Sequence, residues 1–111
     1  MRNIIIYKRY FYEFYENLNL QVREKIDFVL YLVRSTARIP SKFFKHLENT
    51  DGLYEIRVEY SGNIYRIFCC FDEGNLIVLL NGYQKKSQKS PKMDLEKALK
   101  IKAEYFNNKI I

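Results

Sequence analysis

Apolar residues recur along the chain with two periods, and each period predicts a kind of element. A β-branched run of three isoleucines predicts a first strand over Asn3–Tyr7. Apolar residues at helical spacing follow over Arg9–Leu18 and, more regularly, over Leu20–Ser35. Asn17 and Asn19 interrupt the two patterns, and Asn commonly caps a helix. We therefore expect a strand followed by an antiparallel helical hairpin.

The middle of the chain changes to segments typical of strands. Between Pro40 and Gly52 we expect a connection with one short turn, which Ser41 caps. Three β-branched and aromatic segments, separated by Ser-Gly and Glu-Gly turn signals, then predict a meander. These strands are expected over Leu53–Tyr60, Asn63–Asp72 and Asn75–Tyr83.

The last segment predicts a loop and a helix. The loop covers Gln84–Ser90, and Pro91 suits the first helical position behind a Ser90 cap. Leu95, Ala98, Ile101 and Tyr105 would form one face of this helix.

The predicted element order contains no internal repeat and no linker between domains. A chain of 111 residues is long enough for one hydrophobic core, so we expect a single domain over residues 1–111. Its expected class is α+β, in which an N-terminal strand and helical hairpin pack on a mostly antiparallel four-stranded sheet and a C-terminal helix follows.

Composition narrows the classes of function. Hydrophobic residues make up 48% of the chain, which excludes a disordered segment. A formal net charge of +6 favours a polyanion or an acidic protein as partner, with nucleic acid as the leading candidate. No apolar stretch approaches the ~20 residues of a membrane span, and none resembles a secretory signal. Cys69 and Cys70 are adjacent and would point to opposite faces of a strand, so we expect free thiols and a cytoplasmic protein.

The strand register predicts a cationic site. A two-residue turn at Ser61 and Gly62 places Arg57 directly opposite Arg66 on one face of the sheet. Like charges opposite each other are destabilising, so this pair implies an anion between them, such as a phosphate, or a different register. A turn one residue later is the alternative, and it would give Arg66 an ordinary ion pair with Glu59.

The next turn extends the site. If Glu73 and Gly74 form a two-residue turn, Arg66 faces Asn81, Ile64 faces Tyr83, and Lys85 continues the same face. The apolar end of that face would carry Leu53, Phe68, Cys70, Ile77 and Leu79. The opposite face, which the helical hairpin would cover, is expected to carry Tyr54, Ile56, Val58, Tyr65, Ile67, Cys69, Val78 and Leu80.

Lysines gather after the last strand. Lys85, Lys86, Lys89 and Lys92 form either a solvated loop or, since they follow Tyr83, a segment that contacts RNA phosphates. Tyr83 itself could stack on a base. The single histidine, His46, has no metal-ligand partner near it in sequence, and we expect neither a metal nor a cofactor.

Three segments resemble a known family. They are Gly52–Arg57 (GLYEIR), Tyr65–Phe68 (YRIF) and Leu79–Lys86 (LLNGYQKK), the last continued by Ser87–Pro91. Together they resemble the phage-derived, HigB-like branch of the RelE/ParE toxins, and the similarity runs over nearly the whole chain. Such toxins are mostly endoribonucleases that cut mRNA in the ribosomal A site and are neutralised by a paired antitoxin, and a divergent branch poisons DNA gyrase.

The resemblance assigns roles to residues. Arg57 and Arg66 match the family's strand arginines, and Tyr83, Lys85 and Lys86 match its aromatic-x-Lys-Lys segment, so these five are the expected catalytic residues. Asn81, where relatives often carry a histidine, is expected to bind RNA, as are Lys89 and Lys92. The implied partners are mRNA, the ribosome and an antitoxin of helix-turn-helix type. A gyrase poison and a non-catalytic RNA-binding module remain the alternatives, and the general base is left open.

Overall fold

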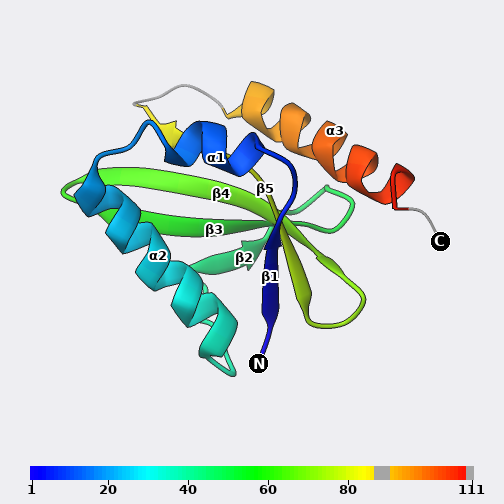
Figure 1. Cartoon of the computed structure of the whole chain (residues 1–111), viewed down its shortest axis with the longest axis horizontal. Helices are drawn as coiled ribbons and strands as arrows, with labels where there is room; N and C mark the ends of the chain where they lie inside the picture. Colours follow the sequence, from blue (N-terminus) through cyan, green and yellow to red (C-terminus); the bar gives the residue numbers. More distant parts are fainter. Residues whose placement is uncertain (87–90, 110–111) are drawn as a thin grey trace.

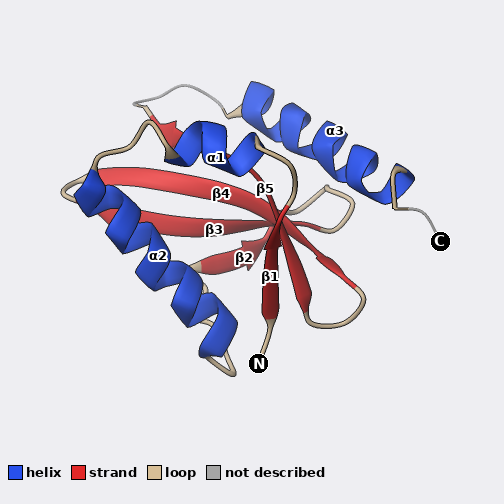
Figure 2. Ribbon diagram, in the orientation of Figure 1, coloured by secondary structure: helices blue, strands red, loops and turns tan. Residues whose placement is uncertain are grey.

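A computed structural model gives the fold, and it describes residues 1–86 and 91–109 (Figure 1). Three helices lie around one twisted sheet (Figure 2). The helices are α1 (Tyr10–Tyr15), α2 (Leu20–Ser35) and α3 (Lys92–Asn107). The strands are β1 (Asn3–Ile6), β2 (Phe44–His46), β3 (Leu53–Tyr60), β4 (Asn63–Asp72) and β5 (Leu76–Lys85). The expected α+β class is confirmed.

The sheet has five strands in the order β1-β5-β4-β3-β2. β1 runs parallel to β5, and the other pairs are antiparallel. The prediction of four strands was wrong because Phe44–His46, expected within a short turn, pairs with Tyr54–Ile56 as an additional edge strand. Phe44 favours this strand because its ring stacks on Tyr54, with 5.1 Å between ring centroids.

Other element boundaries also differ from the prediction. β1 ends one residue earlier, at Ile6, and α1 is shorter than expected. β5 covers Leu76–Lys85 and so begins one residue later and ends two residues later, and α3 begins at Lys92 with Pro91 as its N-cap. Pro91 can serve as the N-cap because its carbonyl still accepts the first hydrogen bond of the helix, from the Leu95 amide at 2.8 Å. The proposed Ser90 cap lies outside the described residues. α2 matches its prediction, and the Asn19 side chain caps it by accepting from the Val22 amide at 2.9 Å.

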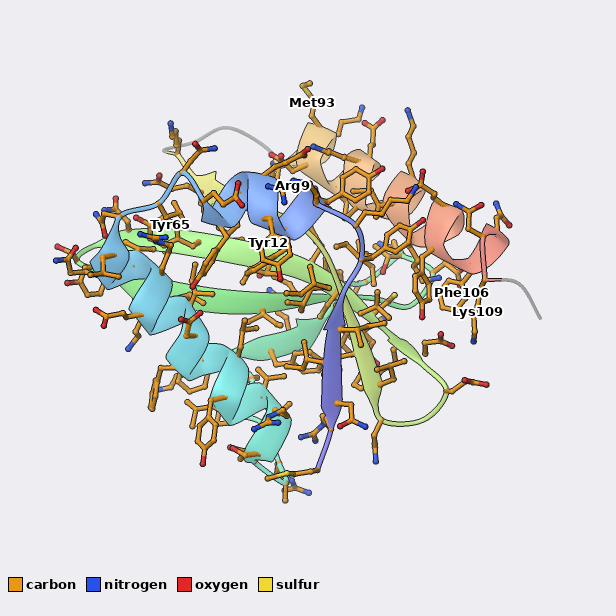
Figure 3. The ribbon with its side chains drawn as sticks, viewed as in Figure 1. Arg9, Tyr12, Tyr65, Met93, Phe106 and Lys109 are labelled. Carbon is orange, nitrogen blue, oxygen red and sulfur yellow. The ribbon has the colours of Figure 1, made fainter. Side chains whose placement is uncertain are left out.

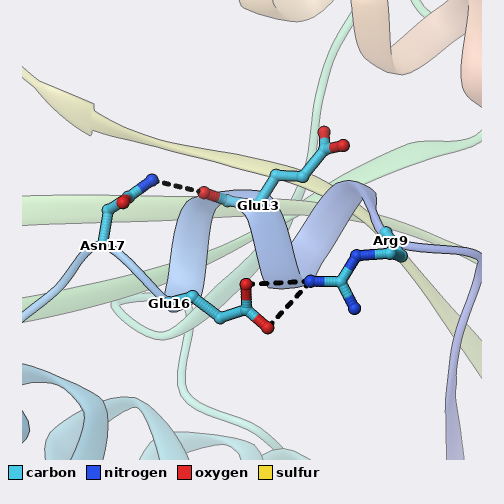
Figure 4. Close-up of polar contacts among 4 residues, drawn as sticks. All are labelled: Arg9, Glu13, Glu16 and Asn17. Atoms are coloured by element: carbon cyan, nitrogen blue, oxygen red, sulfur yellow. Dashed lines mark hydrogen bonds and ion pairs between the residues drawn. The ribbon is translucent and has the colours of Figure 1, made fainter.

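α1 is held at both ends by polar side chains (Figure 4). Both carboxylate oxygens of Glu16 lie 2.8 Å from a nitrogen of Arg9, and the Asn17 amide donates to the Glu13 carbonyl at 2.8 Å. The Tyr15 hydroxyl donates to Asp27 of α2, also at 2.8 Å. These contacts position a helix of one and a half turns that is too short to be stable alone.

Two cores lie on the two faces of the sheet. α1 and α2 cover the first face, where Ile26, Val29 and Val33 of α2 pack against Ile56 and Ile67. α3 covers part of the second face, where its Ala98 and Ile101 pack on a different set of strand residues. That set comprises Leu53, Phe68, Cys70, Val78 and Leu80. Cys69 and Cys70 lie in different cores as free thiols, which confirms their opposite orientation.

The register of β5 corrects part of the predicted faces. Asp72 pairs with Leu76, so the turn contains Asn75 as well as Glu73 and Gly74. This one-residue slip moves Ile77 and Leu79 to the α2 face and moves Val78 and Leu80 to the α3 face, the reverse of the prediction.

Polar contacts fix α3 on the sheet. The Tyr105 hydroxyl donates to the buried carboxylate of Asp72 at 2.7 Å, and the Lys109 ammonium donates to it at 2.9 Å. Figure 3 shows Lys109 beside Phe106 at the C-terminal end of α3, whereas Met93 points into solvent at the other end. α3 is therefore anchored over one end of the second face and leaves the other end open.

Candidate functional site

A row of three polar residues crosses the open end of the second face. Arg57 of β3 lies directly opposite Arg66 of β4, as predicted, and Arg66 lies opposite Tyr83 of β5. We call these three residues the arginine row. The prediction that Arg66 faces Asn81 was wrong because the longer β4–β5 turn and an irregularity between Ile67 and Cys69 shift the pairing.

Each arginine of the row has its own carboxylate. Arg66 forms a hydrogen-bonded ion pair with Glu55, which lies diagonally across β3 and is buried. Arg57 lies 3.7 Å from Glu59, two residues along its own strand and more exposed. The expectation of an anion or a different register was too narrow, because carboxylates from neighbouring positions also relieve the repulsion. The alternative pairing of Arg66 with Glu59 does not occur.

Arg66 keeps unused hydrogen-bonding capacity. Its Nε is buried and has no hydrogen-bond partner among the described residues, although a guanidinium presents five N–H donors. A buried donor without a partner costs about 1–3 kcal/mol. The guanidinium is partly exposed and has further N–H donors besides the one that Glu55 accepts, which makes Arg66 a candidate for binding a phosphate.

Aromatic stacking holds the Tyr83 side chain in place. The ring stacks on Phe68 with 5.6 Å between the centroids and an interplanar angle of 21°. Burial raises the pKa of Tyr83 above its ordinary value of 10.0, and nearby Arg66 opposes that shift. The phenol is therefore protonated at neutral pH, where it can donate a proton but cannot serve as a base.

A hollow of about 300 Å³ adjoins the arginine row on the side toward β2. We call it the central hollow, and its lining is Ser41, Lys42, Phe44, Lys45, Glu55, Arg57 and Arg66. Sequence reasoning missed Lys42, Lys45 and Glu55 as members of the site. For Glu55 a signal was available, since it lies two residues before Arg57 on the same face of a strand. For the two lysines there was none, because β2 was not predicted.

The lysines at the end of β5 and just after it divide between the two faces. Lys85 lies opposite Ile64, on the same face as Tyr83. Lys86 lines a hollow of about 450 Å³ beneath α1, together with Phe14 and Gly82, and so lies away from the arginine row. Lys92 is exposed at the start of α3, and Lys89 lies outside the described residues.

Two further candidates lie apart from the row. Asn81 is buried and uses its side-chain amide to donate to the Asp94 carbonyl at 3.1 Å, which ties β5 to the first turn of α3. His46 is exposed on β2 and packs edge-on against Tyr54, on the α2 face. Within residues 1–86 and 91–109, no three His, Cys, Asp or Glu side chains gather as metal ligands.

The arrangement can bind and polarise a phosphodiester. Arg57, Arg66 and Lys45 supply positive charge, Glu55 supplies a carboxylate that can accept a proton, and Tyr83 supplies a proton donor. These are the groups that acid–base chemistry at phosphorus requires.

Fold and site together define a small α+β domain with a cationic site on the open end of a mixed sheet, where a carboxylate and a phenol lie beside the arginines. The family described as phage-derived protein Gp49-like (DUF891) matches residues 13–103, and the chain belongs to this family. The family is RelE-like and toxin-like, which is consistent with one member of a toxin–antitoxin pair. A search of curated proteins found no match. None of the helices in the described ranges is long and apolar enough to cross a bilayer.

Proposed function

We propose that this protein is the toxin of a type II toxin–antitoxin pair and cuts mRNA on the ribosome without a metal, as an enzyme of the HigB-like branch. The observation that carries the proposal is the arginine row with Glu55 beside it. A cation pair, a proton acceptor and a proton donor meet there on one uncovered patch of sheet.

The first step is attack by the ribose 2′-hydroxyl on the adjacent phosphorus. The 2′-oxygen forms a bond to phosphorus, and its proton passes to a base. Arginine cannot be that base because guanidinium keeps its proton, and Tyr83 cannot because burial raises its pKa. We assign this role to Glu55, the carboxylate of the central hollow.

The second step is departure of the 5′-oxygen. Arg57 and Arg66 stabilise the dianionic phosphorane, the bond from phosphorus to the 5′-oxygen breaks, and Tyr83 or Lys85 gives that oxygen a proton. The products are a 2′,3′-cyclic phosphate and a 5′-hydroxyl end. Asn81 supplies no proton in this scheme, since it is buried against Asp94.

The proposed partner is an antitoxin of helix-turn-helix type that carries an acidic segment. A net charge of +6 attracts such a segment, and the open arginine row is its natural target because binding there would also block RNA. Mixing the two proteins should therefore suppress cleavage.

RNA 5′-end mapping after induced expression tests the activity. Wild-type protein should create new 5′-hydroxyl ends within translated mRNA, and a Glu55→Gln variant, which cannot accept the proton, should not. Growth arrest with intact mRNA and accumulated gyrase–DNA breaks would instead identify a gyrase poison. RNA binding without cleavage by any preparation would identify a binding module.

A further inference from the structure

A second hollow lies at the edge of the sheet, outside the site described above. It measures about 170 Å³, and its lining is Lys25, Lys42, Phe43, Arg57 and Glu59. We call it the edge hollow. It exists because β2 pairs only with Tyr54–Ile56, so the part of β3 beyond Arg57 forms a sheet edge in the described structure. Lys25 reaches this edge from α2, which covers the opposite face.

The edge hollow adjoins the central hollow. Lys42 and Arg57 line both, so the cationic side chains of the two neighbouring hollows reach from Arg66 to Lys25. Lys42 is held there by its neighbour, since its ammonium lies 4.9 Å from the centre of the Phe43 ring. Phe43 in turn is fixed by the hydrogen bond from the Arg57 amide to its carbonyl, at 2.9 Å.

We propose that the edge hollow is a second phosphate-binding position for the RNA strand, held by Lys25 and Lys42. This inference rests on the proposed function, because the strand enters the edge hollow from the arginine row. The strand would thus cross the β3 edge, on the opposite side of the row from Tyr83 and Lys85. The sequence, by contrast, predicted a path for the RNA backbone only along the lysines that follow Tyr83.

RNA fits this surface better than an acidic protein does. Phosphates recur along a strand at every nucleotide, which matches cations that continue from one hollow into the next. Glu59 is the one carboxylate in the edge hollow, and its side chain is 61% exposed beside Arg57. An exposed ion pair of this kind is weak, so Glu59 can swing away when a phosphate arrives.

The test compares single-turnover mRNA cleavage on programmed ribosomes by wild type and by the double variant Lys25→Gln/Lys42→Gln. In the double variant, we expect the toxin concentration that gives half the maximal cleavage rate to rise severalfold. The maximal rate itself should fall by a smaller factor. The logarithmic salt slope should decrease by about 0.7, the value for one lost phosphate contact on a single strand. The matched control is the double variant Lys97→Gln/Lys100→Gln, which also removes two charges, at exposed positions of α3, and should change neither that concentration nor the salt slope. Glu59→Gln should lower the half-saturating concentration.

Substrates with one neutral methylphosphonate at each position then locate the contact. A methylphosphonate at one position other than the cleaved bond should weaken RNA binding by wild type and should not change RNA binding by the double variant. A double variant with wild-type salt slope and half-saturation would overturn the inference, although the proposed function would stand. If the double variant loses affinity for the antitoxin and keeps affinity for RNA, the surface belongs to the protein partner. A wild type that cuts no RNA would instead refute the proposed function itself.

Discussion

Glu55 and Arg66 form a buried ion pair in the middle of an otherwise open cationic surface, with side-chain exposures of 5% and 16%. Taking two charges out of water is costly, and the pair is balanced only while both members are present. The pair therefore links the stability of β3 and β4 to the candidate chemistry. The half-exposed pair of Arg57 and Glu59 has no such role, because water screens it.

Removing Arg66 should cost more stability than removing Arg57. Arg66→Ala leaves the Glu55 carboxylate buried and unpaired, and we expect a loss of about 3 kcal/mol in the free energy of unfolding. Arg57→Ala should cost less than about 1 kcal/mol, because its pair with Glu59 is exposed. Urea denaturation measures both. Both variants should lose toxicity, so Arg57→Ala tests the site in a stable protein, and a folded, fully toxic Arg57→Ala would refute the assignment.

The Tyr83 hydroxyl can be removed without disturbing the ring. Tyr83→Phe keeps the stacking on Phe68, so folding and RNA affinity should be unchanged, whereas cleavage should slow by about 100-fold or more if the phenol donates the proton. Because burial raises the pKa of Tyr83, the wild-type rate should not decline with rising pH until beyond 10.0. A wild-type rate for Tyr83→Phe would move the acid role to Lys85.

Lys85 and Lys86 should differ because they lie on opposite faces of the end of β5. Lys85→Ala should reduce cleavage more than Lys86→Ala, since only Lys85 shares the face of Tyr83. Lys85→Arg then separates proton transfer from phosphate binding, because guanidinium keeps the charge and cannot release a proton. Single-turnover rates measured beside RNA affinity give the answer. A larger loss from Lys86→Ala at unchanged affinity would place the chemistry in the hollow beneath α1.

Much of the fold followed from periodicity, and the errors have physical causes. α2 was predicted to the residue because a long amphipathic pattern and an Asn cap agree. The β3–β4 register was predicted because the Ser-Gly turn allows a two-residue loop, with positive φ at both residues. The Glu-Gly turn carries the same signal and yet includes Asn75. A one-residue choice of this kind depends on tertiary packing, which here places Val78 and Leu80 beneath α3.

The site was predicted in part for the same reasons. The opposition of Arg57 and Arg66 depends on one turn and was confirmed, whereas the partner of Arg66 on β5 depends on two turns and an irregularity. Glu55 was missed because a single acidic residue in a strand usually lies in solvent. Lys42 and Lys45 were missed because their place in the site depends on β2. This strand has three residues, which are too few to show a hydrophobic period.

Asp72 should make the attachment of α3 sensitive to acid. Hydrogen bonds from Lys109 and then Tyr105 lower the pKa of Asp72 below its ordinary value of 3.8. A carboxyl whose pKa is lower in the folded state stabilises the fold above the unfolded pKa, and this contribution disappears as the pH falls through the folded pKa. Asp72→Asn should therefore lower the melting temperature at pH 7, and the difference from wild type should shrink below pH 3.8. A difference independent of pH would contradict the assignment.

Gly82 and Phe14 should show strong energetic coupling. A Cβ built on Gly82 would lie 2.6 Å from the Phe14 ring, and its three nearest atoms all belong to that ring, which α1 places on β5. Gly82→Ala should therefore cost about 1–3 kcal/mol by overpacking and push α1 off the sheet.

The backbone at Gly82 lies outside the left-handed region, so the cost of this substitution is steric alone. Phe14→Ala removes the obstacle, and in that background Gly82→Ala should become neutral or stabilising by about 0.4–1 kcal/mol, because alanine restricts the unfolded chain. Gly62→Ala is the matched control, since it has open space but a φ of +80°, and its cost should be the same with either residue at position 14. Urea denaturation of the four proteins in each cycle measures the coupling. Additive costs at positions 14 and 82 would show that α1 does not rest on β5 through this contact.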